Sequence, residues 1–287
     1  HLPLSIEAQT EARVLMLSTN NIFSPAHGNP IISADQDIVL GCHFLTIEME
    51  KQPGEGKIFT SYDEVRMAYE HKVVSLHSRI KIRLPGGMVI ASSPSVRKPL
   101  KSAELVATTP GRCFFNERLP ASMPFYNFTM DKSTLRRVIA DCFEILGRQA
   151  TINILDYIKE TGFRYSTVAG LSFGMTDLAT PAEKDQIIAN ADAQATKYIK
   201  AYQRGLITAQ ERHRHLRDVW NHATELVGKA LMANLRDAKR EHNYINPVFA
   251  MATSKARGSE AQVRQLAGMR GLMVKPNGEI IETPIRA

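Results

Sequence analysis

The stretch Y-Q-R-G-L-I-T-A-Q-E-R (202–212) contains the signals that end one helix and begin the next. Gly205 is suited to follow the last turn of a helix, because glycine adopts left-handed backbone angles without strain. Thr208, followed three residues later by Glu211, forms a capping box, a pattern typical of a helix N-terminus. Two helices joined by R-G-L-I-T (204–208) must fold back on each other, so the stretch predicts the turn of an antiparallel helical hairpin.

Apolar residues continue at helical spacing on both sides of this turn. Before it, Thr180, Pro181 and Glu183 predict an N-cap, a proline at the first helical position and the acid of a capping box. The predicted seam consists of Ile187, Ala191, Ala195, Tyr198 and Tyr202 in the first helix and Leu216, Val219, Trp220, Ala223, Leu226, Val227 and Ala230 in the second. Its alternating three- and four-residue steps favour a coiled-coil crossing. Each helix should be roughly 30 Å long, so we expect the hairpin, about residues 182–235, to protrude.

Shorter patterns precede the hairpin. Residues 79–84 alternate basic and apolar side chains and predict a half-buried strand. Further short strands are predicted at 89–91, 104–108 and 112–115, with a loop at 92–102.

Two helices are predicted between the strands and the hairpin. Apolar residues at helical spacing predict an amphipathic helix over 131–146 that ends at Gly147, and a second over about 150–159 that stops at Gly162. The predicted fold is therefore α+β and mainly helical: an irregular region with short strands, followed by a long antiparallel helical hairpin.

Composition narrows the classes of partner. The chain has 287 residues, a net charge of +7 and 44% hydrophobic residues, which suits a globular protein with a polyanionic partner. No apolar run is long enough to cross a bilayer, so no membrane partner is expected. The three cysteines lie far apart without Cys-x-x-Cys spacing, which indicates a reducing compartment and no structural zinc site in this chain.

A basic stretch near the end of the chain, S-K-A-R-G-S-E-A-Q-V-R-Q-L-A-G-M-R-G-L-M (254–273), carries a second capping box. Ser259 and Gln262 predict a short helix from Glu260, and Lys255 and Arg257 stand immediately before it. A helix N-terminus flanked by cations favours an anion. The stretch therefore predicts a phosphate-facing helix start beside a mobile, glycine-hinged loop, and the alternative is a basic, solvated turn.

The same stretch and I-I-E-T-P-I (280–285) resemble the loop before the bridge helix in the largest catalytic subunit, beta-prime, of bacterial RNA polymerase. The segments S-T-N-N-I-F-S-P-A-H-G-N-P-I-I (18–32), Q-D-I-V-L-G (36–41) and T-G-F-R-Y-S-T-V-A-G-L-S (161–172) resemble that subunit in the same order. The resemblance implies a pore domain over 1–148, a funnel domain with the rim hairpin over 149–236, and over 237–287 a loop region leading to the bridge helix.

The resemblance also implies roles for individual residues. Arg257 would contact the triphosphate of the incoming nucleotide, with Gln262 beside it. Gln36 and Asn21 would line the active centre, although amides that stabilise a loop are the alternative for both. The residues expected to line the channel are Arg264, Gln265, Arg270 and Met273. Those expected to contact a regulator or an anionic effector at the rim are His213, Arg214 and His215, and a solvated hairpin tip is the alternative.

Two departures from the family pattern are Lys255, where a glycine is common, and Ala34, where many relatives have proline. The Asn-Ala-Asp-Phe-Asp-Gly-Asp motif that holds the catalytic Mg²⁺ in the family would lie just upstream of His1. The expected Mg²⁺ is therefore bound outside this chain, and the chain alone should be inactive.

The resemblance implies a nucleotidyltransferase assembled with the beta, alpha, omega and sigma subunits, in the bacterial cytoplasm at the nucleoid. Its further partners would be template DNA, nascent RNA, nucleoside triphosphates, and the transcript-cleavage and stringent-response factors that enter by the secondary channel. The alternative is a non-catalytic coiled-coil module whose basic patch binds nucleic acid or protein. The two hypotheses differ at Arg257, which lies in a nucleotide channel in the first and on an open surface in the second.

Overall fold

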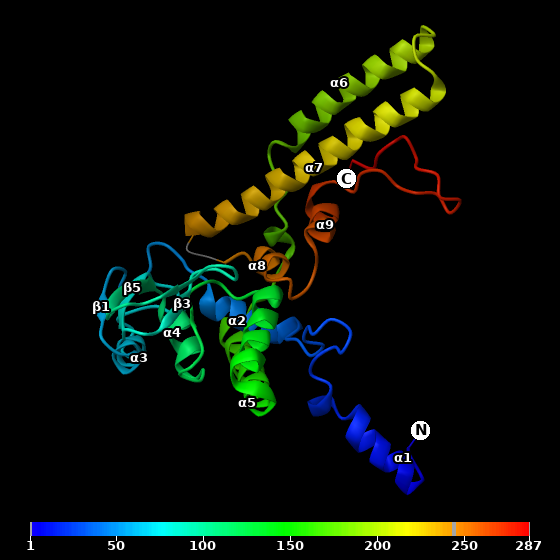
Figure 1. Ribbon diagram of the computed structural model, residues 1–287. Helices are drawn as coiled ribbons and strands as arrows, with labels where there is room; N and C mark the ends of the chain where they lie inside the picture. The colour runs from blue at the N-terminus through cyan, green and yellow to red at the C-terminus, as the bar shows by residue number, and fades with distance from the viewer. Residues whose placement is uncertain (1, 243–244, 287) are drawn as a thin grey trace. The chain divides into compact units, whose positions relative to one another are not determined.

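The computed structural model describes residues 2–242 and 245–286 (Figure 1). The chain forms two compact units, the first made of residues 1–170 with 254–256 and the second of 171–253 with 257–287. Helices predominate and the strands are short, which confirms the predicted mainly helical α+β class.

Two small sheets lie in the first unit. β2 (Ile80–Leu84) pairs in parallel with β1 (Ile58–Phe59) and antiparallel with β5 (Glu104–Thr108). β3 (Val89–Ala91) pairs antiparallel with β4 (Arg97–Pro99) and in parallel with β6 (Phe125–Tyr126). Burial along β2 alternates as predicted, with Ile80, Ile82 and Leu84 inside. The predicted loop at 92–102 contains β4, whose three residues are exposed and carry no apolar pattern.

The first unit also contains five α-helices among its described residues. They are α1 (Ile6–Glu11), which continues into a π-helical turn (Ala12–Met16) and a 3-10 turn (Ser18–Asn20), then α2 (Gln36–Thr46), α3 (Tyr62–Glu70), α4 (Pro110–Glu117) and α5 (Lys132–Ala169). A buried cluster joins strands and helices: Val65, Val74, Ile80, Ile82, Leu84, Ile90, Leu100, Cys113 and Phe125.

The predicted strand at 112–115 is wrong, because these residues belong to α4. Thr109 caps this helix by accepting a hydrogen bond from the Arg112 amide at 3.3 Å, and Pro110 occupies its first turn. Gly111 allows α4 to approach α2, since a Cβ there would lie 1.8 Å from the Leu45 carbonyl oxygen.

The range of α5 contains both helices predicted at 131–146 and 150–159, separated by a kink. Its backbone breaks at Gly147 (φ 76°, ψ −170°), where the first of them was predicted to end. The predicted stop at Gly162 is wrong, because the second segment continues to Ala169 and ends at Gly170 (φ 53°). Gly162 instead allows close contact with α2, where a Cβ would lie 2.6 Å from the Ile38 Cα.

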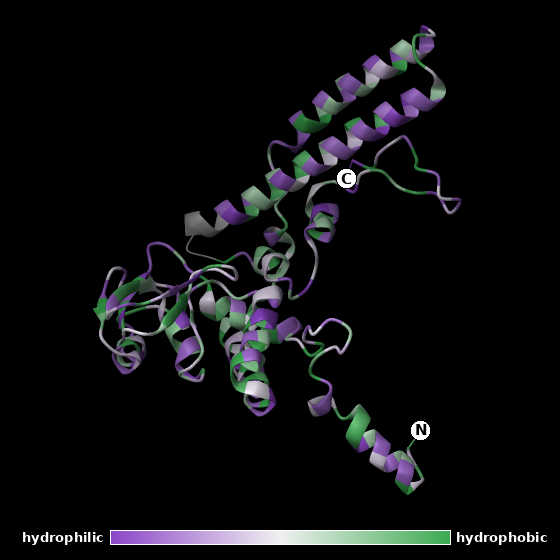
Figure 2. Ribbon diagram, viewed as in Figure 1, coloured by the Kyte–Doolittle hydropathy of each residue, from purple (hydrophilic) through white to green (hydrophobic). Residues whose placement is uncertain are grey.

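The second unit contains the predicted hairpin, formed by α6 (Lys184–Gln203) and α7 (Ala209–His242) (Figure 1). Gly205 (φ 73°) follows the end of α6, and the Leu206 amide donates to the Ala201 carbonyl at 3.0 Å. Thr208 and Glu211 form the predicted box, with bonds of 2.8 Å and 3.2 Å between side chains and amides. The alternation of hydrophilic and hydrophobic residues along both helices can be followed in Figure 2.

The start of α6 differs from its prediction. The helix begins at Lys184, its N-cap position is Glu183, and no side chain caps it. Pro181 lies in a preceding turn, in which its carbonyl accepts from the Lys184 amide at 3.2 Å. The buried seam of the hairpin includes Ala191, Ala195, Leu216, Trp220, Ala223 and Val227, together with Met269 from the end of the chain.

The other helical segments of the described residues are a 3-10 turn (Met175–Asp177), α8 (Pro247–Ser254), α9 (Glu260–Val263) and a π-helical turn (Arg264–Gly268). The segment expected to be a mobile, glycine-hinged loop packs against α7. Met269 is fully buried, a Cβ on Gly268 would lie 3.2 Å from Val227 Cγ1, and one on Gly271 (φ 84°) would lie 3.0 Å from Thr224 Oγ1. These glycines let the chain lie close against α7, and the backbone bridge between Gly271 and Ile285 then closes the final segment.

Candidate functional site

The turn from Ser254 to Gly258 places Arg257 between two left-handed residues. Lys255 has a φ of 58° and Gly258 a φ of 81°. Ser254 is fully buried and its hydroxyl accepts from the Ala256 amide at 3.2 Å. A left-handed lysine is strained and a left-handed glycine is not, which gives a physical reason for the glycine expected at position 255 in relatives.

Lys255 reaches a carboxylate that sequence reasoning missed. Its Nζ lies 3.5 Å from Oδ2 of Asp131, the N-cap of α5. Burial raises the pKa of Asp131, but hydrogen bonds from Thr134 and Ser133 outweigh it and hold that pKa below its usual value. The carboxylate is therefore charged at neutral pH. Asp131 and Lys255 are 124 positions apart in the sequence, so no local pattern could have joined them.

Arg257 is exposed, and no described residue makes a hydrogen bond or ion pair with its side chain. A guanidinium carries five N–H donors in a fixed plane and pairs readily with phosphate oxygens. The arrangement leaves those donors available to an anionic ligand.

The predicted capping box beside Arg257 is confirmed. The Ser259 hydroxyl accepts from the Gln262 amide at 3.3 Å, and Gln262 Oε1 accepts from the Ser259 amide at 2.8 Å. Two of the amides at this helix start are thereby occupied, and α9 is only four residues long. These contacts favour the alternative of a basic, solvated turn over a phosphate-facing helix start, and they leave the Arg257 guanidinium as a cation of the turn that no described residue pairs with.

The four residues expected along the channel follow Arg257 in one continuous stretch, but their surroundings differ. Arg264 lays its aliphatic stem against Gly228, where a Cβ would meet Arg264 Cδ at 3.0 Å. Its Nε is buried and has no hydrogen-bond partner among the described residues. Gln265 and Arg270 are exposed, and Met273 is half-buried with its carbonyl accepting from the Ile281 amide at 2.8 Å.

Asn21 and Gln36 lie in the first unit. The Asn21 side-chain amide donates to the carbonyls of Leu15 at 2.5 Å and Leu17 at 3.1 Å, so it ties down the end of the π-helical turn. This geometry favours the alternative of a loop-stabilising amide. Gln36 is exposed and begins α2 with a φ of 45°, and its backbone amide donates to Asp35 Oδ1 at 2.9 Å.

The three residues expected at the rim, His213, Arg214 and His215, make different contacts. His215 stacks on Tyr198 of α6, with ring centroids 4.6 Å apart. His213 Nδ1 lies 3.1 Å from Glu282 Oε1. Arg214 is largely exposed, and its Nε lies 4.0 Å from Asp218. Among the three, Arg214 is the most available to a binding partner.

Glu282 fastens the final segment of the chain to α7 in the second unit. It accepts from Arg212 at 2.7 Å and 3.0 Å and also contacts His213. Burial raises the pKa of Glu282, but the bonds from Arg212 and His213 outweigh it, so that pKa lies below its usual value. Sequence reasoning used this glutamate only as part of the 280–285 resemblance and missed its partner.

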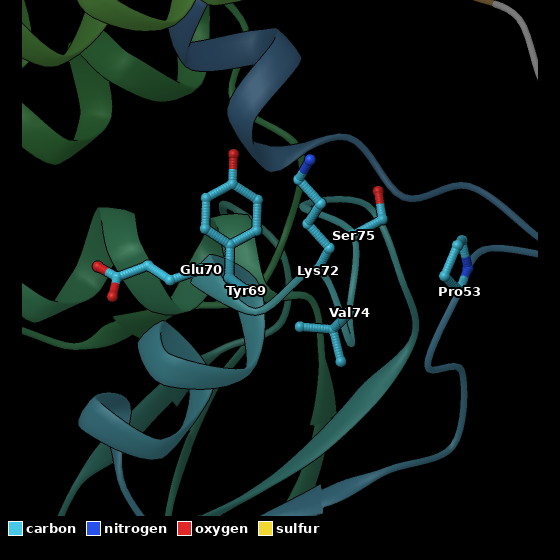
Figure 3. Close-up of a pocket in the computed structure, with 6 residues that line it drawn as sticks. All are labelled: Pro53, Tyr69, Glu70, Lys72, Val74 and Ser75. Atoms are coloured by element: carbon cyan, nitrogen blue, oxygen red, sulfur yellow. The ribbon is translucent and has the colours of Figure 1, made fainter.

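Two cavities lie in the first unit, and none of the predicted site residues lines either of them. One, of about 400 Å³, is shown in Figure 3 and is lined by Pro53, Tyr69, Glu70, Lys72, Val74 and Ser75. The other, of about 530 Å³, lies among α3, α4 and α5, where Arg118 lies over the Tyr157 ring and Arg164 over the Tyr165 ring.

Over residues 2–242 and 245–286, no three His, Cys, Asp or Glu side chains are grouped to hold a metal ion. In the same residues, no helix combines the length and apolar character needed to cross a bilayer.

Comparison with known families decides the assignment. A model of RNA polymerase Rpb1, domain 3, matches residues 21–178, which is more than half of the chain. This chain belongs to the RNA polymerase Rpb1 family. A second model, RNA polymerase Rpb1, domain 4, matches residues 207–286.

The individual relatives of this chain are also RNA polymerase subunits. It is 51% identical over 288 residues to the DNA-directed RNA polymerase subunit beta′ of Rhodopirellula baltica, a match covering 100% of this chain and 20% of the relative. It is 44% identical to the subunit beta′ of Pelotomaculum thermopropionicum, covering 100% and 23%, and 42% identical to that of Xanthomonas euvesicatoria pv. vesicatoria, covering 100% and 21%. The chain thus spans about a fifth of the length of these relatives, and its resemblance to an internal part of bacterial subunit beta′ is confirmed.

Proposed function

We propose that this chain is the part of a bacterial DNA-directed RNA polymerase that forms the secondary channel and presents Arg257 to the triphosphate of the incoming nucleotide. The two Rpb1 matches in consecutive order support the placement. The observation that carries the role of Arg257 is its exposed side chain without a carboxylate partner among the described residues.

The chemistry of Arg257 follows from its charge. Phosphoryl transfer depends mainly on positioning the triphosphate and neutralising its charge. The guanidinium would donate two parallel hydrogen bonds to phosphate oxygens and hold the triphosphate at the channel end of the active centre. Gln262, Arg264, Gln265, Arg270 and Met273 would line the passage. The resemblance gives Gln36 a lining role at the active centre, whereas the Asn21 amide is bonded within its own loop.

Mg²⁺ would supply the remaining charge neutralisation when bound. As the family resemblance implies, the residues that hold Mg²⁺ would lie in a part of the subunit outside this chain. The chain on its own would then make no RNA. Its activity would require the beta, alpha, omega and sigma subunits with template DNA and nascent RNA, in the bacterial cytoplasm at the nucleoid.

The hairpin of α6 and α7 would form the rim of the channel and receive transcript-cleavage or stringent-response factors. Arg214 supports this role best, because His213 and His215 already contact Glu282 and Tyr198.

Substitution of Arg257 in the assembled polymerase tests the proposal. Losing a charge-assisted hydrogen bond costs about 1.5–3 kcal/mol, so Arg257→Ala should raise the nucleotide KM by roughly ten- to hundredfold. Arg257→Lys should give an intermediate KM, since an ammonium keeps the charge but not the paired geometry. Arg136→Ala, which removes another exposed arginine, is the control and should leave KM unchanged. An unchanged KM in Arg257→Ala would instead favour the non-catalytic binding module.

A further inference from the structure

Lys255 lies two residues before Arg257 and forms an ion pair with the carboxylate of Asp131. The Nζ of Lys255 lies 3.5 Å from Asp131 Oδ2, and the lysine side chain is otherwise largely exposed. A lysine with a φ of 58° is held in a backbone conformation that its side chain disfavours. The ion pair with Asp131 is an interaction outside the turn that favours this conformation.

The other end of the ion pair is rigid. Asp131 caps α5: its Oδ1 accepts from the Thr134 amide at 2.7 Å, and its own amide donates to Thr134 Oγ1 at 2.6 Å. The Ser133 hydroxyl donates to both carboxylate oxygens, at 2.8 Å and 2.9 Å. These bonds fix the orientation of the Asp131 carboxylate independently of Lys255.

The backbone around Lys255 is also anchored. Ser254 and Ala256 are buried, and the Ser254 hydroxyl accepts from the Ala256 amide. Arg257 follows Ala256 directly, so the conformation of residues 254–256 sets the direction in which the chain enters Arg257. The ion pair ties a side chain of this turn to the N-cap of α5.

We infer that Lys255 is a positioning residue for Arg257, because its ion pair with Asp131 holds the turn that presents the guanidinium. The inference rests on the proposed function of Arg257 as the triphosphate contact. Lys255 itself would not touch the nucleotide, since its ammonium is directed to Asp131.

The experiment uses polymerase assembled with the full-length subunit and measures nucleotide KM and kcat for four variants. Lys255→Met removes the charge and keeps the stem, and it should raise KM about two- to fivefold with little change in kcat, the size of an exposed ion pair. Asp131→Asn loses the charge but remains a good N-cap, so it should reproduce that rise without unfolding α5. Lys255→Arg, the conservative variant, should restore the KM of the wild type.

The fourth variant, Lys255→Met combined with Arg257→Ala, shows how Lys255 acts. A positioning residue works only through Arg257, so the double variant should have the KM of Arg257→Ala alone. Additive effects would mean that Lys255 binds the nucleotide directly and would overturn the inference, as would an unchanged KM in Lys255→Met and Asp131→Asn. If Arg257→Ala itself leaves KM unchanged, the proposed function fails. If Arg257→Ala raises KM and Lys255→Met does not, only the positioning role fails.

Discussion

Gly41 of α2 and Gly162 of α5 lie back to back where the two helices cross, so close that a Cβ on Gly41 would lie 1.8 Å from the Gly162 carbonyl oxygen. A Cβ on Gly162 would in turn lie 2.6 Å from both the Cα and the carbonyl oxygen of Ile38. The obstacles are backbone atoms, which cannot move aside as a flexible side chain does. This crossing joins α2 to the longest helix of the first unit.

Alanine at either glycine should therefore push the helices apart. Overpacking costs about 1–3 kcal/mol and more where backbone must shift, so Gly41→Ala and Gly162→Ala should each lower the free energy of unfolding by at least that amount and shift the denaturant midpoint down accordingly. Gly174→Ala is the matched control, because the nearest atom to its Cβ would be Thr176 Oγ1 at 3.8 Å. Equal midpoints for all three variants would show that the crossing is looser than described.

Asp141 should be a second stability determinant of the first unit. Its buried carboxylate accepts from Arg97 at 2.6 Å on both oxygens, from the Tyr126 hydroxyl at 2.9 Å, and lies 3.0 Å from Arg137. Removing one partner of a buried ion pair costs about 3–5 kcal/mol. Asp141→Ala should therefore lower the free energy of unfolding by about that amount. The exposed pair of Asp156 and Lys159 is the control, and Asp156→Ala should cost less than about 1 kcal/mol. A similar loss in both variants would contradict this ranking.

The contact of Glu282 with α7 should weaken in acid. The folded-state pKa of Glu282 lies below its ordinary value of 4.5. A depressed carboxyl pKa contributes stability that is full above the unfolded-state value and is lost as pH falls through the folded-state value. Hydrogen exchange of residues 271–286 should therefore show protection that is steady above about pH 4.5 and declines below it. Glu282→Gln should show weaker protection with a flatter pH dependence, and a parallel decline in that variant would assign the effect to another group.

Arg214 should matter more than its neighbours for binding at the rim. Arg214→Ala should weaken binding of a secondary-channel regulator to the assembled polymerase by about two- to tenfold, because it removes an available cation. His215→Ala should instead loosen the hairpin, since it removes the stack on Tyr198. Titration of a labelled regulator measures the first effect, and hydrogen exchange across 198–215 the second. A larger loss of regulator affinity in His215→Ala than in Arg214→Ala, with unchanged hydrogen exchange across 198–215, would contradict these separate roles.

Local signals predicted the elements whose causes are local. The turn at Gly205 and the boxes at Thr208 and Ser259 are confirmed because each involves residues within a few positions of one another. The prediction of a strand at 112–115 was wrong because it did not take into account the helix cap formed by Thr109 and Pro110 just in front of it. Gly162 was misjudged because its role is a contact with α2, more than a hundred positions away.

The candidate site shows the same division. The sequence predicted the capping box of Ser259 and Gln262, and the family resemblance implied the role of Arg257. The sequence alone could not reveal the partner of Lys255 or of Glu282, because only folding brings Asp131 and Arg212 close to them. Likewise, the packing of Gly268 and Gly271 on α7 is a tertiary effect that in sequence looks like flexibility.

Inhibition of the assembled polymerase by inorganic triphosphate tests the central role of Arg257 most directly, because this ligand offers the guanidinium only phosphate oxygens. The proposal predicts that Arg257→Ala weakens competitive inhibition by roughly tenfold or more, while Arg136→Ala leaves it unchanged. Equal inhibition constants for the wild type and Arg257→Ala would show that the guanidinium does not meet the triphosphate.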